Sequence, residues 1–301
     1  MLLQQIINGL TIGSVYALIA LGYTMVYGIL QLINFAHGEI YMIGAYMGII
    51  AIGFFIYLGI PDISIALTLI LTFLTAIIFT GAYGITLERI AYRPLRNAPR
   101  LSILISAIGM SILLQNYVML AQGARDKIFP HDLKIQGDIV IADAHITYTQ
   151  VLIMALSILM MAGLTWFIKK TRVGMAMRAT AQDMRMAGLL GIDTNRIIVI
   201  TFLIGSILAG AAGVMISMYY GIVNFYMGYV AGIKAFTAAV LGGIGNIPGA
   251  VLGGLLLGLL EALGAGYISS EYKDVFAFAI LVLVLIFKPT GLLGERVSDK
   301  V

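Results

Sequence analysis

Long apolar runs separated by short polar segments dominate the chain. Eight runs have about the length of a bilayer-crossing helix, at 5–30, 39–59, 63–87, 101–122, 149–168, 197–219, 249–265 and 273–287, and a shorter one lies at 233–243. A bilayer core calls for about 20 mostly apolar residues in helix, because unpaired backbone groups are costly in hydrocarbon. The pattern predicts an all-α, polytopic transmembrane helix bundle that forms one domain over residues 1–301.

The composition supports this class. Of 301 residues, 61% are hydrophobic and only 11% are charged, and the mean hydropathy is +1.02. Soluble domains carry about 25% charged residues, so a soluble fold is excluded. The chain has no cysteine and three histidines, which excludes disulfides and Cys-type metal centres and leaves little for any other metal site.

Most basic residues lie in three clusters beside apolar runs. They are Arg89, Arg93, Arg96 and Arg100; Lys169, Lys170, Arg172, Arg178, Arg185 and Arg196; and Lys288, Arg296 and Lys300. The positive-inside rule assigns such segments to the cytoplasm, which argues against nucleic acid as a partner. We expect a cytoplasmic loop at 169–196, a cytoplasmic carboxyl terminus, and a periplasmic loop at 123–148.

These orientations require the chain to turn back in two places. The return between 220 and 249 has only the short run at 233–243 available, which predicts a broken or re-entrant helix. A second broken segment is expected within 20–37. The first run lacks the basic flank and cleavage site of a signal peptide, so it is interpreted as a retained span. The side of the amino terminus stays open, and an even crossing count favours the cytoplasm.

Glycine marks both regions. Pairs four residues apart, such as Gly9 with Gly13 and Gly254 with Gly258, predict close helix packing. The segments 34–39 and 245–249 each open a glycine-containing apolar helix, which suggests a weak internal repeat of 5–87 and 197–287. Proline within the second segment favours an unwound stretch near a pathway. Its pathway candidates are Gly242, Gly243, Gly245, Asn246, Pro248 and Gly249.

Two carboxylates lie close to the membrane interior. Glu39 follows Asn34, His37 and Gly38, and Glu261 lies within a leucine-rich run. Intramembrane charges usually face a polar cavity or a partner, which favours a gating or pathway role. A structural role near an interface, where a helix start favours an anion, stays open for both. His37 is interpreted as a hydrogen-bonded residue at a helix start.

The loop at 169–196 contains helix-forming residues over 175–190, followed by Gly191 as a stop. Its methionines and basic residues fit either a helix lying on the membrane surface or a docking element for a cytoplasmic partner. The chain has no Gly-x-x-x-x-Gly-Lys-Ser/Thr phosphate loop and no Ser, His and Asp grouping. These absences favour a transport subunit over an enzyme.

Three blocks carry a resemblance to a known family. They are Gly13-Ser14-Val15-Tyr16-Ala17-Leu18 through Gly22 to Gly28 and on to Asn34-Phe35-Ala36-His37-Gly38-Glu39; the stretch Gly174 to Gly191; and Leu241-Gly242-Gly243-Ile244-Gly245-Asn246-Ile247-Pro248-Gly249-Ala250. Together they resemble the LivH-type permeases of bacterial ABC importers for branched-chain amino acids, over nearly the whole chain.

The resemblance implies a division of labour. The chain would pair with a homologous LivM-type permease, two cytoplasmic ATPases that bind the ATP, and a periplasmic binding protein delivering leucine, isoleucine or valine across the inner membrane. A coupling helix at about 181–190 would contact an ATPase. Its candidate residues are Arg178, Asp183, Met184, Arg185, Ala187 and Gly188. The alternatives are a permease for urea, amides or other amino acids, and a stand-alone channel or ion-coupled carrier that uses Glu39 or Glu261.

Overall fold

The computed structural model describes residues 1–294 apart from 97, 131–132, 134, 136 and 142–143. Seven helices are long and apolar enough to cross a membrane: α1 (Leu2–Leu30), α2 (His37–Tyr57), α4 (Ile65–Leu87, continued by the short helices η1, Glu88–Tyr92, and η2, Arg93–Leu95), α5 (Arg100–Gln122), α6 (Tyr148–Lys170), α9 (Thr194–Tyr220) and α11 (Ile247–Tyr267). This confirms the predicted polytopic helix bundle.

Shorter elements complete the described part of the chain. They are α3 (Ile60–Ile63), α7 (Arg172–Gln182), α8 (Met184–Leu189), α10 (Met227–Gly242), α12 (Lys273–Phe287) and strands β1 (Lys127–Ile128), β2 (Asp138–Ile141), β3 (Ala144–Thr147) and β4 (Ile222–Val223). β2 and β3 form an antiparallel hairpin, and β1 pairs antiparallel with β4. The run expected as an eighth span is α12, which at 15 residues is about 22 Å long and shorter than a bilayer core.

Helices α1 and α9 lie largely inside the bundle, whereas α4, α5 and α6 expose most of their surface. The contact of α1 with α11 is a contact between backbones. A Cβ placed on Gly258 would lie 2.3 Å from the Cα of Gly13, and one on Gly254 would lie 2.5 Å from the Cα of Ala17. Because no side chains separate the helices, their axes approach closely. The packing role predicted for these glycines is confirmed.

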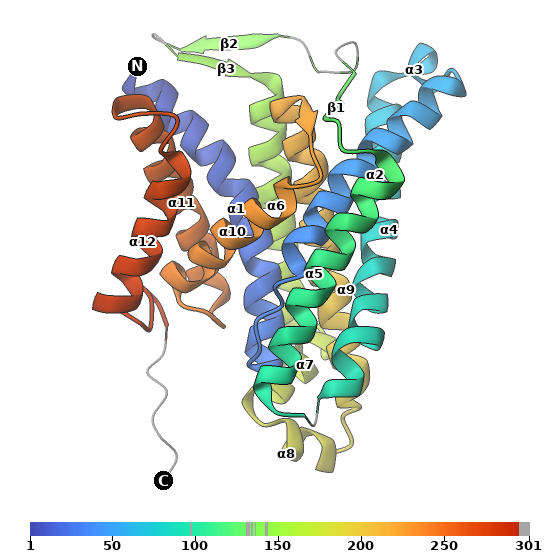
Figure 1. The fold of residues 1–301 in the computed structure, drawn as a ribbon, viewed down its shortest axis with the longest axis vertical. Coiled ribbons are helices and arrows are strands. Elements are labelled where there is room, and N and C mark those ends of the chain that lie inside the picture. The colour runs from blue at the N-terminus through green and yellow to red at the C-terminus, as the bar shows by residue number, and fades with distance from the viewer. Residues whose placement is uncertain (97, 131–132, 134, 136, 142–143, 295–301) are drawn as a thin grey trace.

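Successive long helices run in alternating directions (Figure 1). Helices α4, α6 and α12 run toward the end of the bundle where α8 protrudes, and the hairpin β2–β3 covers the other end. We call these the α8 end and the hairpin end. The amino terminus lies at the hairpin end, whereas α12 runs toward the α8 end. An even crossing count would place the amino terminus and the end of α12 on the same side, and the structure has them on opposite sides. Arg296 and Lys300 lie outside the described residues.

Two non-helical segments interrupt the bundle, at 31–36 between α1 and α2 and at 221–226 between α9 and α10. The break expected within 20–37 is therefore confined to its last part, because α1 is continuous to Leu30. Both preceding helices end in a left-handed residue, Gln31 with φ 53° and Gly221 with φ 75°. The short run at 233–243 is the second half of α10, whose glycine-rich first turns had the composition of a loop.

The segment matching 34–39 in the second half is not 245–249. Asn34-Phe35 precedes the start of α2 by the same spacing as Asn224-Phe225 precedes the start of α10. By contrast, 245–249 contains the first residues of α11, a helix that follows a tight turn. The repeat of 5–87 and 197–287 stays a prediction. Within it, the segment 34–39 corresponds to 224–229.

Candidate functional site

The loop between α6 and α9 contains two helices instead of one. Thr171 caps α7 by accepting a hydrogen bond at its Oγ1 from the N–H of Gly174 (3.0 Å). Asp183 then leaves the helical conformation, and its Oδ1 accepts from the N–H groups of Arg185 and Met186 at 2.9 Å each. The continuous helix expected over 175–190 is wrong, because an aspartate satisfies the free N–H groups at a helix start better than it fits a helix interior.

Helix α8 protrudes at one end of the bundle (Figure 1), and it carries apolar side chains that are exposed. Met186, Leu189 and Leu190, which we call the α8 face, are exposed by 55, 82 and 77%. A Cβ placed on Gly188 would meet no atom within 4 Å. Within the described part of the chain, this face is therefore uncovered and accessible to another molecule.

The other coupling candidates have different surroundings. Ala187 is buried and Met184 is half-buried against the bundle core, so these two attach α8 to the bundle. Arg185 is exposed. Arg178 donates a hydrogen bond to the carbonyl of Ile168 near the end of α6, where helix carbonyls lack intrahelical partners. Of the six candidates, Asp183 therefore caps α8, Met184 and Ala187 attach it to the bundle, Arg178 and Arg185 are its basic neighbours, and Gly188 lies on its exposed side.

The starts of α2 and α10 meet inside the bundle. A Cβ on Gly38 would lie 2.3 Å from the carbonyl oxygen of Gly228 and 2.7 Å from the Cα of Gly232. Both helices begin at buried positions, since His37, Gly38 and Gly228 are buried. We call the meeting point of segments 31–36 and 221–226 with these two helix starts the hinge junction.

Glu39 is buried at the hinge junction, with 1% of its surface exposed. Its Oε1 accepts a hydrogen bond from Ser111 Oγ of α5 (3.0 Å). Its Oε2 has no hydrogen-bond partner among the described residues, and it lies where a Cβ on Gly228 would be only 2.5 Å away. The carboxylate therefore lies in the first turn of α2 and against the first turn of α10, and both helix dipoles favour an anion there.

Asn34 and His37 are also buried at the hinge junction, with 1 and 2% of their surface exposed. Asn34 Oδ1 accepts a hydrogen bond from the hydroxyl of Tyr92 (2.7 Å). The ring of His37 lies edge-on to Tyr23, with centroids 4.8 Å apart, and fills the space beside Gly22. These contacts favour a role for both in holding segment 31–36 in place.

A cavity of about 420 Å³ opens beside the hinge junction. Aromatic and aliphatic side chains form most of its wall, including Tyr23, Phe35, Tyr226 and Tyr229, and Ser111 and Gln115 contribute polar groups. Ser111 joins this wall to the carboxylate of Glu39 behind it. An apolar cavity with a few polar groups on one side suits a small ligand with an aliphatic body and polar ends.

The glycine-rich segment 242–249 is a tight turn held by hydrogen bonds and not an unwound helix. Asn246 Oδ1 accepts from the N–H of Gly249 (3.1 Å), and Pro248 lies in the first turn of α11, where its missing N–H costs nothing. Leu292 and Leu293 donate backbone hydrogen bonds to the carbonyls of Leu241 and Gly242 at 2.8 and 2.9 Å. Gly242 also contacts Gly249 backbone to backbone.

Gly245→Val is expected to destabilise this turn through the backbone conformation of Gly245 and not through crowding. A Cβ at Gly245 would meet no atom within 4 Å, but its φ is +93°. We expect the variant to lose about 1–2 kcal/mol of stability, the cost of a left-handed conformation for an L-residue. Thermal unfolding in detergent measures this loss. Gly53→Val is the control, because that glycine has open space and no positive φ; equal losses in the two variants would contradict the conformational explanation.

Lys234 is an important residue that was not among the candidates predicted from the sequence. Its Nζ forms ion pairs with Glu261 Oε1 (2.7 Å) and Asp274 Oδ1 (2.6 Å), and the Lys234 and Glu261 side chains are each 4% exposed. The hydroxyl of Tyr16 donates to Glu261 Oε2 (2.9 Å). This network joins α10, α11, α12 and α1, which favours the structural interpretation of Glu261. A single lysine within the apolar run at 233–243 was the available signal.

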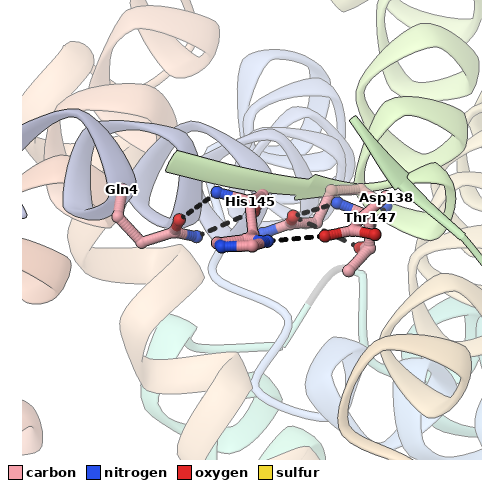
Figure 2. Close-up of polar contacts among 5 residues, drawn as sticks. Gln4, Asp138, His145 and Thr147 are labelled. Atoms are coloured by element: carbon pink, nitrogen blue, oxygen red, sulfur yellow. Dashed lines mark hydrogen bonds and ion pairs between the residues drawn. The ribbon is translucent and has the colours of Figure 1, made fainter. Parts of the chain in front are cut away.

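A second polar cluster fastens the hairpin to α1 (Figure 2). Gln4 accepts from the N–H of His145 (2.8 Å) and donates to its carbonyl (3.1 Å), while His145 Nδ1 lies 2.6 Å from Asp138 Oδ2. A cavity of about 590 Å³ beneath the hairpin is lined by Gln4, His145 and the buried Gln150. Amide and backbone hydrogen bonds therefore hold the hairpin to α1, and a cavity with polar lining residues lies beneath it.

No group of three or more His, Cys, Asp or Glu side chains that could hold a metal occurs among the described residues. The described geometry instead offers two surfaces of interest, the uncovered α8 face at one end and the hinge junction with its cavity inside the bundle.

Comparison with known proteins gives near full-length matches. The model of a family described as branched-chain amino acid transport system / permease component matches residues 5–285. The high-affinity branched-chain amino acid transport system permease protein BraD of Pseudomonas aeruginosa is 54% identical over 99% of this chain and 98% of its own. LivH of Salmonella typhimurium is also 54% identical, over 99 and 97%. A probable LivH of Methanocaldococcus jannaschii is 27% identical over 97 and 92%.

Proposed function

Since the chain belongs to the family of branched-chain amino acid transport permeases, we propose that it is the membrane subunit through which leucine, isoleucine or valine is imported. The observation that carries this proposal is the 53–54% identity, over nearly the full length, to permeases of high-affinity branched-chain amino acid transport systems. The multi-pass bundle and the cavity at the hinge junction support it.

We propose that energy enters through the α8 face. Apolar side chains that protrude from the bundle without cover suit a groove on another protein better than water. The partners proposed are two cytoplasmic ATPases that bind the ATP, a second homologous permease, and a periplasmic binding protein. The sequence has no phosphate-loop motif, so the ATP would be bound by these partners. Movement of α8 would reach the bundle through Ala187 and Met184, which pack against it.

The orientation proposed follows the positive charge. The first two basic clusters lie from the end of α4 to the start of α5 and from the end of α6 to the first turn of α9. These segments lie at the α8 end (Figure 1), and basic residues collect on the cytoplasmic side of a membrane. The hairpin end would then face the periplasm, and with it the amino terminus. The membrane would be the bacterial inner membrane.

The pathway proposed passes the hinge junction. The aromatic and aliphatic wall of the 420 Å³ cavity matches a branched aliphatic side chain, and Glu39 behind Ser111 is placed to attract the ammonium group of an amino acid. The two helix starts approach each other closely through the backbone of Gly38 and Gly228, so they can separate with little rearrangement of side chains. Among the gate residues predicted from the sequence, Gly38 and Glu39 have the geometry closest to this role.

Glu39→Gln is expected to lower leucine uptake about 10- to 100-fold, because a hydrogen bond to a charged group contributes about 1.5–3 kcal/mol. The amide keeps an acceptor for Ser111, so the fold is retained. Uptake into proteoliposomes measures the effect. The control is Glu271→Gln, which removes a charge at an exposed position. Unchanged uptake in Glu39→Gln would place the carboxylate outside the pathway.

The substrate class is tested by competition. The complete transporter with its cognate binding protein is expected to take up labelled leucine and to be inhibited by unlabelled isoleucine and valine, but not by urea or short amides. Uptake of urea without leucine would contradict the assignment and favour the related amide permeases.

A further inference from the structure

A second cavity lies at the α8 end, between the ends of α1 and α6, helix α7 and the turn before α11. Its volume is about 540 Å³. Its wall carries two cationic side chains, Lys169 and Arg178, together with the polar side chains of Tyr27, Gln31 and Gln182. Among the described residues that line it, none is acidic. The cavity is therefore a concentration of positive charge and hydrogen-bond donors.

Most of these donor side chains form no hydrogen bond within the described part of the chain. Within the described part of the chain, the side chains of Lys169, Gln31, Gln182 and Tyr27 form no hydrogen bond or ion pair. Arg178 uses one N–H group on the carbonyl of Ile168, which fixes the guanidinium at the wall and leaves its other N–H groups available. Free donors and uncompensated positive charge together favour an anionic ligand with several acceptor oxygens.

The backbone at this cavity is also unusual. Gln31 has a φ of +53°, and it is the one residue other than glycine with a positive φ among those the structure describes. A left-handed glutamine costs about 1–2 kcal/mol. The left-handed conformation ends helix α1, of which Gln31 is the C-cap, and it places Gln31 in the cavity wall.

We propose that this cavity binds a phosphate-class oxyanion, and that its source is the headgroup of an anionic phospholipid in the adjacent leaflet. Trp166, 63% exposed, lies one turn before Lys169 on α6, and tryptophan followed by lysine marks the level of the lipid headgroups. Basic pockets between membrane helices suit such headgroups. The inference is independent of which solute the chain transports.

The test uses the single tryptophan of the chain, which neighbours the cavity-lining residue Thr165. The full-length protein in neutral detergent is titrated with dihexanoyl-phosphatidylglycerol, with dihexanoyl-phosphatidylcholine and with inorganic phosphate, and Trp166 emission is followed. The variant is Lys169→Gln. Its matched control is Lys170→Gln, which removes the same charge at the next position but does not line the cavity.

Phosphatidylglycerol is expected to change the emission saturably, and phosphatidylcholine is expected to have no such effect. Lys169→Gln is expected to weaken the binding of phosphatidylglycerol at least tenfold, whereas the affinity of Lys170→Gln stays within about twofold of the wild type. Inorganic phosphate binding as tightly as phosphatidylglycerol would overturn the lipid source and leave a soluble oxyanion. Absence of saturable binding by both anions, or equal weakening in the two variants, would overturn the site.

Discussion

Lys234→Met is expected to lower the free energy of unfolding by about 3–5 kcal/mol, because it leaves buried carboxylate without its counter-charge. The lysine pairs with Glu261 and Asp274, and the Glu261 side chain is nearly inaccessible to water. The network also connects α10 to three other helices, so its loss is expected to loosen α12 first. Thermal and denaturant unfolding of the purified protein in detergent measures the change.

The double variant Lys234→Met/Glu261→Gln separates charge from packing. It removes the unpaired anion and keeps an acceptor for the hydroxyl of Tyr16, which now bonds Glu261 Oε2. We expect it to recover at least half of the lost stability. If the single variant unfolds like the wild type, or if the double variant is no better than the single one, the ion pair is not what stabilises this region.

Gly188→Trp is expected to abolish ATP-driven transport while leaving the protein folded. The position has open space around its Cα, so the indole fits without a clash, but it projects from the helix that carries the α8 face. A bulky ring there would keep a partner from closing onto Met186 and Leu189. Leucine uptake and ATP hydrolysis by the reconstituted complex, together with co-purification of the ATPases, measure the effect.

Gly163→Trp is the matched control. It adds the same side chain at an exposed helix position with open space, on α6 and away from α8. Asp183→Lys is a less selective alternative because Asp183 also caps α8, so the helix itself would fray. Normal transport in Gly188→Trp would show that α8 lies on the membrane surface and transmits nothing.

Much of the fold was predictable because hydrophobic runs and their flanks determine membrane helices directly. The bounds of α5, α6 and α9 agree with the apolar runs to within a few residues. Glycine spacing predicted close packing, and Gly13 and Gly258 make such a contact. These features depend on local composition, which a single sequence contains.

The features that were not predicted depend on contacts between residues far apart in the sequence, or on single residues that depart from the local composition. Lys234 is explained only by Glu261 and Asp274, which lie 27 and 40 positions away in the sequence. The first turns of α10 are rich in glycine because they pack against the start of α2, and glycine without that context indicates a loop. The split at Asp183 was readable in principle, since aspartate is a strong helix cap. The side of the amino terminus was obscured because α10 was counted as a fragment.

The most direct test of the central claim is leucine accumulation in proteoliposomes that contain this chain with its homologous permease, its ATPases and its binding protein. Labelled leucine is expected to accumulate only when hydrolysable ATP is available to the ATPases, and a non-hydrolysable analogue is expected to give no accumulation. Equal uptake without ATP, or by this chain without the ATPases, would contradict it and establish a channel or ion-coupled carrier.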